Sequence, residues 1–301
     1  MEVYSETGEF SKNLFYIDTF AHGMRRSIGI FVLKNGSECA IFDSGMPNSS
    51  SEILKSLKKL GIDLESIRYI FLTHRHIDHA GSSANLFEKL TNASVGMHPY
   101  SVKQLMEPSK IYHSGKELFG DFASPMKPLE VTSIRTLQDG EEINIGKEIV
   151  KAIYTPGHTS DHISYYIPSR KTLFCGDLIG LFNPKTMQLY PACMYPSFNY
   201  QKFQVSMEKI SSIDLEFLVF PHFGVVMEND SSLIIEDSLA THQRLFEIVE
   251  KHKGNAKNEE LLKEVKAELD ATAIFPDSVR ERAVEFMAKG FIEGLDPLKT
   301  S

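Results

Sequence analysis

Three histidines and one aspartate lie within six residues of this chain, at His74, His76, Asp78 and His79. In an extended segment His74 and His76 project to the same side, and we expect Asp78 and His79 in the turn that follows. Neutral imidazole and carboxylate oxygen both bind zinc and related divalent ions. The cluster therefore predicts metal binding, although any one of these histidines alone is more simply explained as a surface or core residue.

Three more candidate ligands follow short apolar runs further along the chain. His158 comes after Thr155-Pro156-Gly157, Asp177 follows Leu173–Gly176, and His222 follows Val219–Pro221. Loops at the ends of strands are where a rigid sheet presents functional side chains. A pair of metal ions needs a full set of ligands on each side and a bridge between them. We therefore expect His158 and His222 to add one ligand each and Asp177 to supply the bridge.

The elements that must position these residues alternate between strand and helix. Asn35-Gly36 marks a turn, and Ser50–Leu60 has apolar residues at helical spacing. The predicted strands are Leu14–Phe20, Ile28–Leu33, Cys39–Phe42, Arg68–Leu72, Ser94–Met97, Glu142–Ile145, Ile149–Tyr154, His162–Ile167, Thr172–Cys175 and Phe217–Phe220. The predicted helices in this part are Ser50–Leu60, Gly81–Leu90 and Tyr200–Ile210. The chain is thus predicted to be an α/β protein.

Two segments depart from this alternation. Residues 98–138 contain four prolines and are predicted to form short helices and loops, as a lid-like insertion. After Gly224 the pattern is helical, with predicted helices at Ser231–His252, Asn258–Leu269 and Pro276–Gly294 and a break at Gly254. We predict a main domain of residues 1–230 and a helical C-terminal subdomain of residues 231–301. Its apolar positions predict docking onto the main domain or onto a partner, so an oligomer is one expectation.

Composition limits the classes of partner. An apolar content of 42% and a charged content of 24% are ordinary for a globular protein of 301 residues. The formal net charge of −8 disfavours nucleic acid and anionic membranes as partners, so we expect a small-molecule substrate. No apolar run approaches the roughly 20 residues of a membrane span. Three widely spaced cysteines and an acidic, polar N-terminus predict a reducing compartment, the cytoplasm.

The seven candidate ligands resemble those of the metallo-β-lactamase-fold hydrolase superfamily over about Leu14 to Gly224. Residues 155–162 and 175–177 resemble its glyoxalase II-like and β-lactamase-like branches, whereas Pro221-His222-Phe223-Gly224 departs from the usual Pro-Gly-His-Gly. The resemblance implies an αββα four-layer sandwich, here with an all-helical C-terminal extension. It implies one metal at His74, His76 and His158 and a second at Asp78, His79 and His222, with Asp177 as the bridge.

The resemblance also implies roles around the metals. Asp43 matches an early strand-end aspartate and is expected to hold a ligand in place, with capping of its own turn as the alternative. His162 is expected to support the site without binding metal. Asp78 and Asp177 are the expected catalytic residues. Lactonases of the superfamily carry a tyrosine at the position of Gly180. Tyr190 and Tyr195 are candidates to replace it, with packing as the simpler interpretation of both.

The predicted activity is hydrolysis of a small-molecule ester, thioester or lactone by a hydroxide that bridges two divalent metal ions. Zinc is the expected ion, with iron or manganese as alternatives. Two other functions use the same ligands. One is metal-dependent phosphodiesterase or nuclease activity, which the acidic charge disfavours. The other is an iron-containing oxidoreductase of the same fold.

Overall fold

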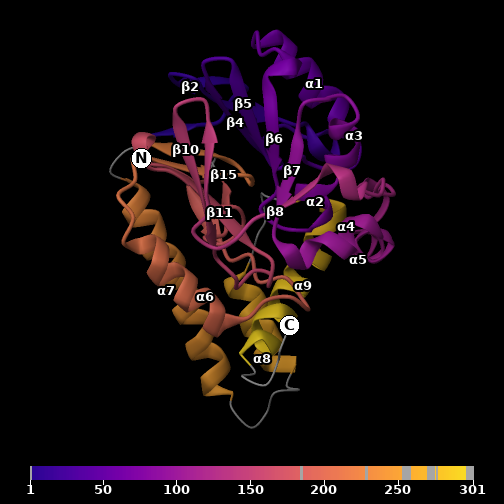
Figure 1. The fold of residues 1–301 in the computed structure, drawn as a ribbon. Helices are drawn as coiled ribbons and strands as arrows, with labels where there is room; N and C mark the ends of the chain where they lie inside the picture. The colour runs from indigo at the N-terminus through magenta and orange to yellow at the C-terminus, as the bar shows by residue number, and fades with distance from the viewer. Residues whose placement is uncertain are drawn as a thin grey trace.

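The computed structural model describes residues 2–183, 186–227, 230–252, 259–269, 275 and 277–295. Within these residues two seven-stranded sheets face each other, and helices cover their outer faces (Figure 1). No helix in these ranges is long and apolar enough to cross a membrane. The predicted starts of the last two helices, Asn258 and Pro276, and the predicted break at Gly254 fall outside the described residues.

The N-terminal half of the chain forms one sheet. Its strands lie side by side in chain order: β2 (Gly8–Ser11), β3 (Leu14–Asp18), β4 (Gly29–Asn35), β5 (Glu38–Phe42), β6 (Ile67–Phe71), β7 (Ser94–Met97) and β8 (Ile134–Thr136). The strands from β5 to β8 are parallel, whereas β2 to β5 are antiparallel. The predicted Asn35-Gly36 turn joins β4 to β5, with Gly36 at a φ of 61°.

The second sheet comes mainly from the C-terminal half. Its spatial order is β1 (Val3–Tyr4), β16 (Gly224–Met227), β15 (Phe217–Phe220), β12 (Thr172–Phe174), β11 (Ile163–Ile167), β10 (Glu148–Tyr154) and β9 (Glu142–Ile145). A separate hairpin pairs β13 (Leu181–Asn183) with β14 (Gln188–Tyr190). The sequence patterns located all ten strands that they predicted. They missed β1, β2, β8, β13, β14 and β16, which are short and in part lie at sheet edges.

Each central strand is buried on both faces. Along β4, Phe31 and Leu33 point between the sheets, whereas Ile30 and Val32 point toward the outer helices. β15 alternates in the same way, with Phe217 and Val219 on the inner face. This arrangement explains why these strands read as continuous apolar runs. The inner core is rich in aromatic rings, since Phe42 contacts the rings of Phe31, Phe71, Tyr165 and Phe174.

The helices near the site differ in one place from the prediction. The expected helix Gly81–Leu90 is instead two short helices, α2 (Ile77–Ala80) and α3 (Ser83–Phe87). The hydroxyl groups of Ser82 and Ser83 donate to the carbonyls of Met46 and Ala80, which interrupts the regular helical pattern. Asp78 and His79 therefore lie on a helical turn and not in the simple turn that we expected.

The remaining helices lie close to their predicted positions. Asn199 caps one of them, α6, because its side-chain oxygen accepts a hydrogen bond from the backbone N–H of Lys202. The α-helices are α1 (Ser50–Lys59), α4 (Val102–Met106), α5 (Ser109–Phe119), α6 (Tyr200–Ser211), α7 (Asp230–Lys251), α8 (Glu259–Glu268) and α9 (Asp277–Gly294). Short 3₁₀ helices occur at Ala21–Gly23, Leu64–Ser66, Pro99–Ser101, Gly120–Phe122, Val131–Ser133 and Pro168–Arg170.

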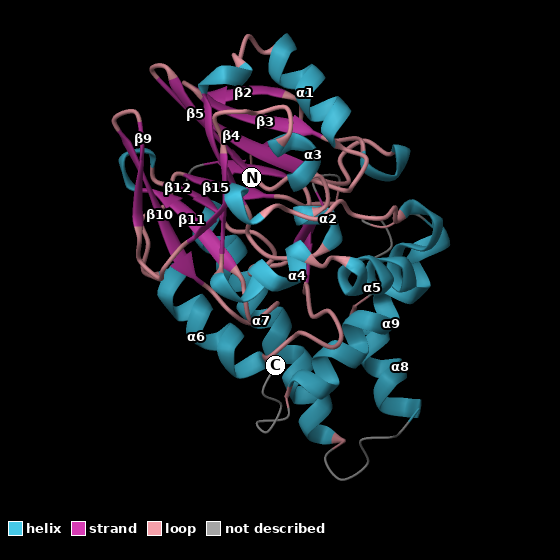
Figure 2. Ribbon diagram, turned by 45° about the vertical axis from the view of Figure 1, so that its right-hand side comes forward, coloured by secondary structure: helices cyan, strands magenta, loops and turns pink. Residues whose placement is uncertain are grey.

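The segment 98–138 forms helices and loops, as predicted, but its end joins the first sheet as β8. Helices α4 and α5 of this segment lie at the same end of the molecule as α9 (Figure 2). Arg282 of α9 donates from Nε to the carbonyl of Leu118 in α5, at 3.1 Å. The insertion and the C-terminal helices are thus in direct contact.

Five strands end at one edge of the sandwich. β5 and β6 are parallel, and β10, β12 and β15 run in one direction because β11 is antiparallel to both β10 and β12. Bonds between the sheets lock this edge, since Ile163 N–H donates to Thr73 O at 2.8 Å and Tyr165 Oη donates to Leu72 O at 2.7 Å. The segments that carry the candidate ligands therefore leave the sheets at the same place.

Helix α9 approaches the loop 192–198 unusually closely. A methyl group at Gly290 would lie 1.9 Å from the carbonyl oxygen of Cys193 and 2.5 Å from the backbone nitrogen of Tyr195. The N–H of Tyr195 also donates to the carbonyl of Phe286, at 3.1 Å. Only glycine leaves room for this backbone contact, so Gly290 sets the position of the helix on the loop.

We predict that Gly290→Ala destabilises the protein by about 1–3 kcal/mol, because the added methyl group forces α9 away from the loop. Helix propensity alone predicts the opposite, a gain of about 1 kcal/mol. Urea unfolding measures the difference, and Lys289→Ala, an exposed neighbour on the same helix, serves as the control. A more stable Gly290→Ala protein would contradict the close contact.

Candidate metal centre

Three imidazoles meet at the shared edge of the sheets. The Nε2 atom of His74 lies 2.9 Å from Nδ1 of His76 and 3.2 Å from Nε2 of His158, and the last two atoms are 3.0 Å apart. Ligands at 2.0–2.1 Å from a tetrahedral zinc ion are separated from one another by roughly 3.3 Å. The three nitrogens thus have nearly the spacing of one face of a zinc site.

A second group of three lies beside the first. Nε2 of His222 is 3.2 Å from Oδ2 of Asp78 and 3.3 Å from Nε2 of His79. Asp177 lies between the groups, because its Oδ2 is 3.3 Å from Nε2 of His79 and 3.4 Å from Nε2 of His158. All seven residues that the sequence singled out therefore converge, in the two sets of three and with the intermediate carboxylate that were predicted.

The centre of the cluster contains a polar atom that lacks a hydrogen-bond partner, and its ion-pair contact with Nε2 of His222 is long, at 3.9 Å. Oδ1 of Asp177 is buried and makes no hydrogen bond within the described part of the chain. A buried carboxylate oxygen without a partner is costly, and a cation beside it removes that cost. Together with the nitrogen spacing, this atom indicates that the residues present fit a pair of divalent ions.

The other ring nitrogen of four histidines is held from outside the cluster. Nδ1 of His158 lies 2.5 Å from the carbonyl oxygen of Ala192, and Nδ1 of His222 lies 3.2 Å from the carbonyl oxygen of Ser27. Nδ1 of His74 is 3.0 Å from the Thr73 hydroxyl, and Nδ1 of His79 is 2.8 Å from Oδ2 of Asp43. A carbonyl or carboxylate acceptor fixes the proton on Nδ1, which leaves Nε2 free to bind a metal.

Asp43 connects two parts of the centre. It directly follows β5, is fully buried, and has a φ of 63°, a left-handed conformation that aspartate tolerates better than most residues. Its carboxylate accepts from the Thr73 N–H at 2.8 Å and from the Thr73 hydroxyl at 3.0 Å, and it also contacts His79. The single carboxylate thus orients His79 directly and His74 through Thr73.

His162 holds the loop of Asp177 and does not face the cluster as a ligand. Its Nε2 accepts the backbone N–H of Asp177 at 3.0 Å, and its Nδ1 is 2.8 Å from the Thr155 hydroxyl. Burial lowers its pKa to about 3, so the ring stays neutral and can accept. Gly176 is required beside it, because its φ is 57° and a Cβ atom there would lie 2.4 Å from Nε2 of His162.

Burial and charge set the protonation of the cluster. Burial, helped by neighbouring imidazoles, lowers the pKa of His74 well below its usual value, so this ring is neutral. Burial opposes charge on His79 and Asp177 too, but opposite charges outweigh it. Asp177, Asp78 and Asp43 raise the pKa of His79 well above its usual value, and the imidazoles led by His79 lower that of Asp177. The carboxylates therefore favour positive charge at this point.

The family model of the metallo-beta-lactamase superfamily matches residues 25–222, which include all seven of these residues. The chain belongs to the metallo-beta-lactamase superfamily. It is 26% identical over 218 residues to the metallo-beta-lactamase fold-containing protein ST1585 of Sulfurisphaera tokodaii, covering 70% of this chain and 76% of that protein. It is 29% identical over 200 residues to hydroxyacylglutathione hydrolase 1 of Vibrio vulnificus, covering 66% of this chain and 63% of that enzyme.

Solved structures show the same fold. The crystal structure of ST1585 from Sulfolobus tokodaii superposes with a TM-score of 0.67 at 22% identity, covering 94% of this chain and 99% of that chain. The TTHA1429 protein of Thermus thermophilus, from the same family, gives a TM-score of 0.64 at 21% identity, covering 95% and 93% of the two chains. The predicted sandwich with its helical extension is therefore confirmed, and the superfamily fold together with the His–Asp cluster indicates divalent metal binding.

The cluster opens into a cavity of about 640 Å³. Its walls come from the metal motif, the insertion helices α4 and α5, the loop 192–198 and helix α9. The lining residues are Arg75, His76, Ile77, Asp78, Lys103, Gln104, Glu107, Ser109, Lys110, Ile111, Ser114, Gly115, Leu118, Phe119, His158, Asp177, Leu181, Met194, Tyr195, Pro196, Ser197, His222, Phe275 and Phe286. The cluster is therefore open to the cavity between the insertion and the tail.

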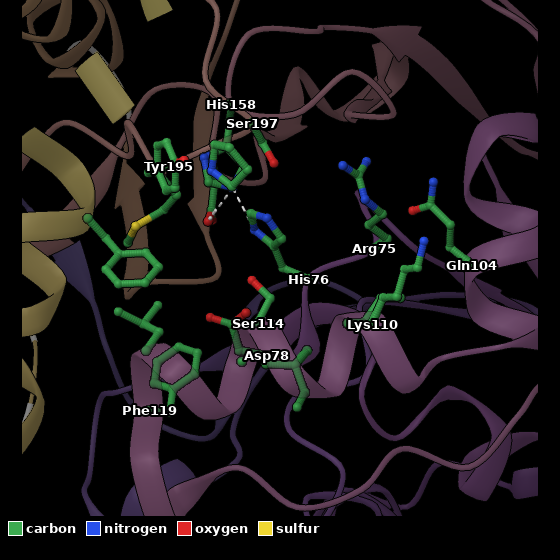
Figure 3. A pocket seen from close by; sticks show the side chains of 18 of the residues that line it. Arg75, His76, Asp78, Gln104, Lys110, Ser114, Phe119, His158, Tyr195 and Ser197 are labelled. Atoms are coloured by element: carbon green, nitrogen blue, oxygen red, sulfur yellow. Dashed lines mark hydrogen bonds and ion pairs between the residues drawn. The ribbon is translucent and has the colours of Figure 1, made fainter. Parts of the chain in front are cut away.

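The two candidate tyrosines, Tyr190 and Tyr195, lie in different environments in the structure. Tyr190 is buried and donates its hydroxyl to Gln188, whereas Tyr195 lines the cavity close to His158 (Figure 3). Tyr195 thus reaches the cavity, as one of the two interpretations allowed, and also packs against Phe286. Gly180 is followed directly by the β13 strand, and a side chain there would lie 2.5 Å from the Tyr190 carbonyl. A tyrosine therefore does not fit at the lactonase position in this backbone.

Sequence reasoning gave no role to Asp161, which holds the metal motif in place. Its buried carboxylate accepts from the backbone N–H of Arg75 at 3.0 Å and from the Ser101 hydroxyl at 2.6 Å, and it pairs with the Arg75 guanidinium. It thereby ties the loop of His74 and His76 to the start of the insertion. Its place directly before His162 was the available signal, but nothing in the sequence identified Arg75 as its partner.

We predict that Asp43→Asn weakens zinc binding by about 10- to 100-fold, the usual effect of losing a residue that orients a ligand. The amide has the same size, but it cannot present two anionic oxygens to Thr73 and His79. Competition with a chromogenic chelator measures the affinity, and the exposed Asp214→Asn serves as control. Unchanged zinc affinity in a folded Asp43→Asn protein would remove this role.

Proposed function

We propose that this chain is a metal-dependent hydrolase that cleaves the carbonyl group of a small ester, thioester or lactone with two divalent ions. The observation that carries the proposal is the pair of three-ligand groups, with Asp177 between them, at the floor of a cavity large enough for a small molecule. The superfamily relationship supports the reaction class. The likeness to the Vibrio hydroxyacylglutathione hydrolase supports a thioester, although the match spans less than two thirds of that enzyme.

The seven candidate ligands would bind the two metal ions in two groups of three with one shared carboxylate. His74, His76 and His158 would hold one ion and Asp78, His79 and His222 the other, with the Asp177 carboxylate shared between them. Zinc is our first choice because imidazole and carboxylate suit it, with iron or manganese as alternatives. When bound, such ions supply an activated water near neutral pH and stabilise negative charge on the carbonyl oxygen.

The protein's own contribution is to keep this geometry fixed while substrate enters. Asp43 and the carbonyls of Ala192 and Ser27 hold the imidazoles, and His162 holds the Asp177 loop. Asp161 and Arg75 fix the segment between His74 and His76. Six of the seven candidate ligands are buried, with Asp78, His158, Asp177 and His222 each less than 8% exposed, and His76 is partly exposed where it lines the cavity. Bulk water therefore reaches them mainly through the cavity.

We predict that His76→Ala and Asp177→Ala each lower kcat/KM by on the order of 1,000-fold or more, because each removes a side chain that acts as part of a unit. Steady-state assays with p-nitrophenyl esters, thioesters and lactones measure the loss, and circular dichroism checks the fold. His113→Ala, an exposed histidine on α5, is the matched control. Wild-type turnover in both folded variants would reject the assignment.

We also predict that a chelator abolishes activity and that added zinc restores it, because none of the proposed chemistry proceeds without the ions. Elemental analysis of the purified protein identifies the metal. A panel that includes bis-p-nitrophenyl phosphate tests the phosphodiesterase alternative, for which turnover of the phosphate diester alone is the expected sign. Full activity in the metal-free protein would contradict the proposal.

A further inference from the structure

The cavity has two chemically different sides. On one side of His76 lie Phe119 of α5 and Tyr195 of the loop 192–198 (Figure 3), and the ring of Phe286 in α9 packs against that of Tyr195, with centroids 6.4 Å apart. Leu181 of β13, Met194 and Phe275 add apolar side chains to the lining. Phe119, Leu181, Met194 and Phe275 are each at most 9% exposed. These rings and the Met194 thioether offer contacts that suit an apolar group.

The other side is polar and positively charged. Arg75, Gln104 and Lys110 lie on the opposite side of His76 from Phe119, with Asp78 between them (Figure 3). Lys103, the residue before Gln104 on α4, also lines the cavity. These residues come from the metal motif and from the insertion, so the charged side is a property of this chain's own insertion and not of the metal ligands.

The charges on this side do not cancel. Asp161 neutralises Arg75, but Lys103 and Lys110 make no ion pair within the described ranges. Glu107, the acidic residue of the insertion that lines the cavity, offsets one of the two lysines. One positive charge is left in excess at the rim, and both lysines are exposed, so they can move to meet a ligand.

We propose that the substrate is a two-ended molecule, with an apolar acyl group on the Phe119 and Phe286 side and a single carboxylate on the Lys103 and Lys110 side. This inference rests on the proposed function, which places the scissile carbonyl at the metal ligands between the two sides. A single excess positive charge matches one carboxylate, and the Gln104 amide adds a hydrogen-bond donor.

The enclosure of the two sides sets the orientation. The acyl group occupies the closed apolar side, where desolvation is most complete. The carboxylate belongs to the leaving group and lies at the exposed rim. Hydrolysis breaks the bond between the carbonyl carbon and the sulfur or oxygen of the leaving group, and the oxygen of water takes its place on the carbon. The leaving thiol or alcohol receives a proton and departs from the open side with its carboxylate.

Four matched thioesters test the proposal. Their acyl group is acetyl or hexanoyl, and their leaving group is 3-mercaptopropionate or its neutral analogue of similar shape, 3-mercaptopropionamide. Thiol release is followed with a disulfide reagent, which is practical because Cys39, Cys175 and Cys193 are all buried. We expect kcat/KM to favour hexanoyl over acetyl by at least about tenfold. We expect it to favour the carboxylate over the amide by about three- to tenfold at low salt.

Variants assign each preference to one side of the cavity. In Lys103→Ala/Lys110→Ala the preference for carboxylate over amide falls toward one, whereas Lys58→Ala/Lys59→Ala, with the same change in net charge on α1, keeps it. In Phe286→Ala the preference for hexanoyl over acetyl falls several-fold. Phe246→Ala, a partly buried phenylalanine of α7 that does not line the cavity, keeps that preference.

The outcomes separate this inference from the proposed function. Hydrolysis of all four thioesters at equal rates would overturn the two-ended substrate and leave the hydrolase intact. A chain-length preference that is unchanged in Phe286→Ala would overturn the apolar side as its source. Hydrolysis of none of these thioesters or of the wider ester and lactone panel by the zinc-loaded protein would instead overturn the proposed function.

Discussion

The buried carboxylate of Asp43 is the contact on which the rest of the centre depends. It is fully buried, and a charge in that position is tolerated only when strong partners surround it. Its partners are Thr73 at the end of β6 and His79 on α2. The same interaction therefore joins two neighbouring strand ends and orients an imidazole of the centre. The hydrogen bonds that stabilise the buried Asp43 carboxylate in the folded protein are the same ones that position His79 as a metal ligand.

The core of the sandwich explains how such a point stays rigid. The aromatic rings around Phe42, the residue before Asp43, fill the space between the sheets. A backbone hydrogen bond from Ile163 to Thr73 connects one sheet to the other. The four segments that carry the seven ligands, and the fifth that carries Asp43, then leave from a common, packed edge. Short loops on such an edge have little freedom, so the spacing of the nitrogens is determined by the sheets.

The sequence predicted the centre better than its surroundings, and the reason is physical. The seven ligands could be found because each follows an apolar strand, a pattern that residue types and spacing alone reveal. The strands that were missed, such as β13 and β16, are three or four residues long and carry no alternation to detect. The helix expected from Gly81 was interrupted by serine hydroxyls whose acceptors, such as Met46, are distant in sequence.

The residues that line the cavity could not be predicted from the sequence for a similar reason. Asp161 and Arg75 are 86 positions apart, and no local pattern pairs them. Phe119 and Phe286 come to the same cavity from the insertion and from the tail, which is a product of how α5 and α9 pack. Local patterns thus locate chemistry on strands, whereas specificity arises from contacts between segments that are far apart.

The close contact at Gly290 has a consequence for how the protein can diversify. Helix α9 presses on the backbone of Cys193 and Tyr195, and the neighbouring Ala192 carbonyl holds the ring of His158. The terminal helices are therefore not interchangeable modules. A tail borrowed from a related protein would have to bring a compatible loop with it, or it would tilt an imidazole more than a hundred positions upstream. Inheritance is therefore expected to keep these two segments matched.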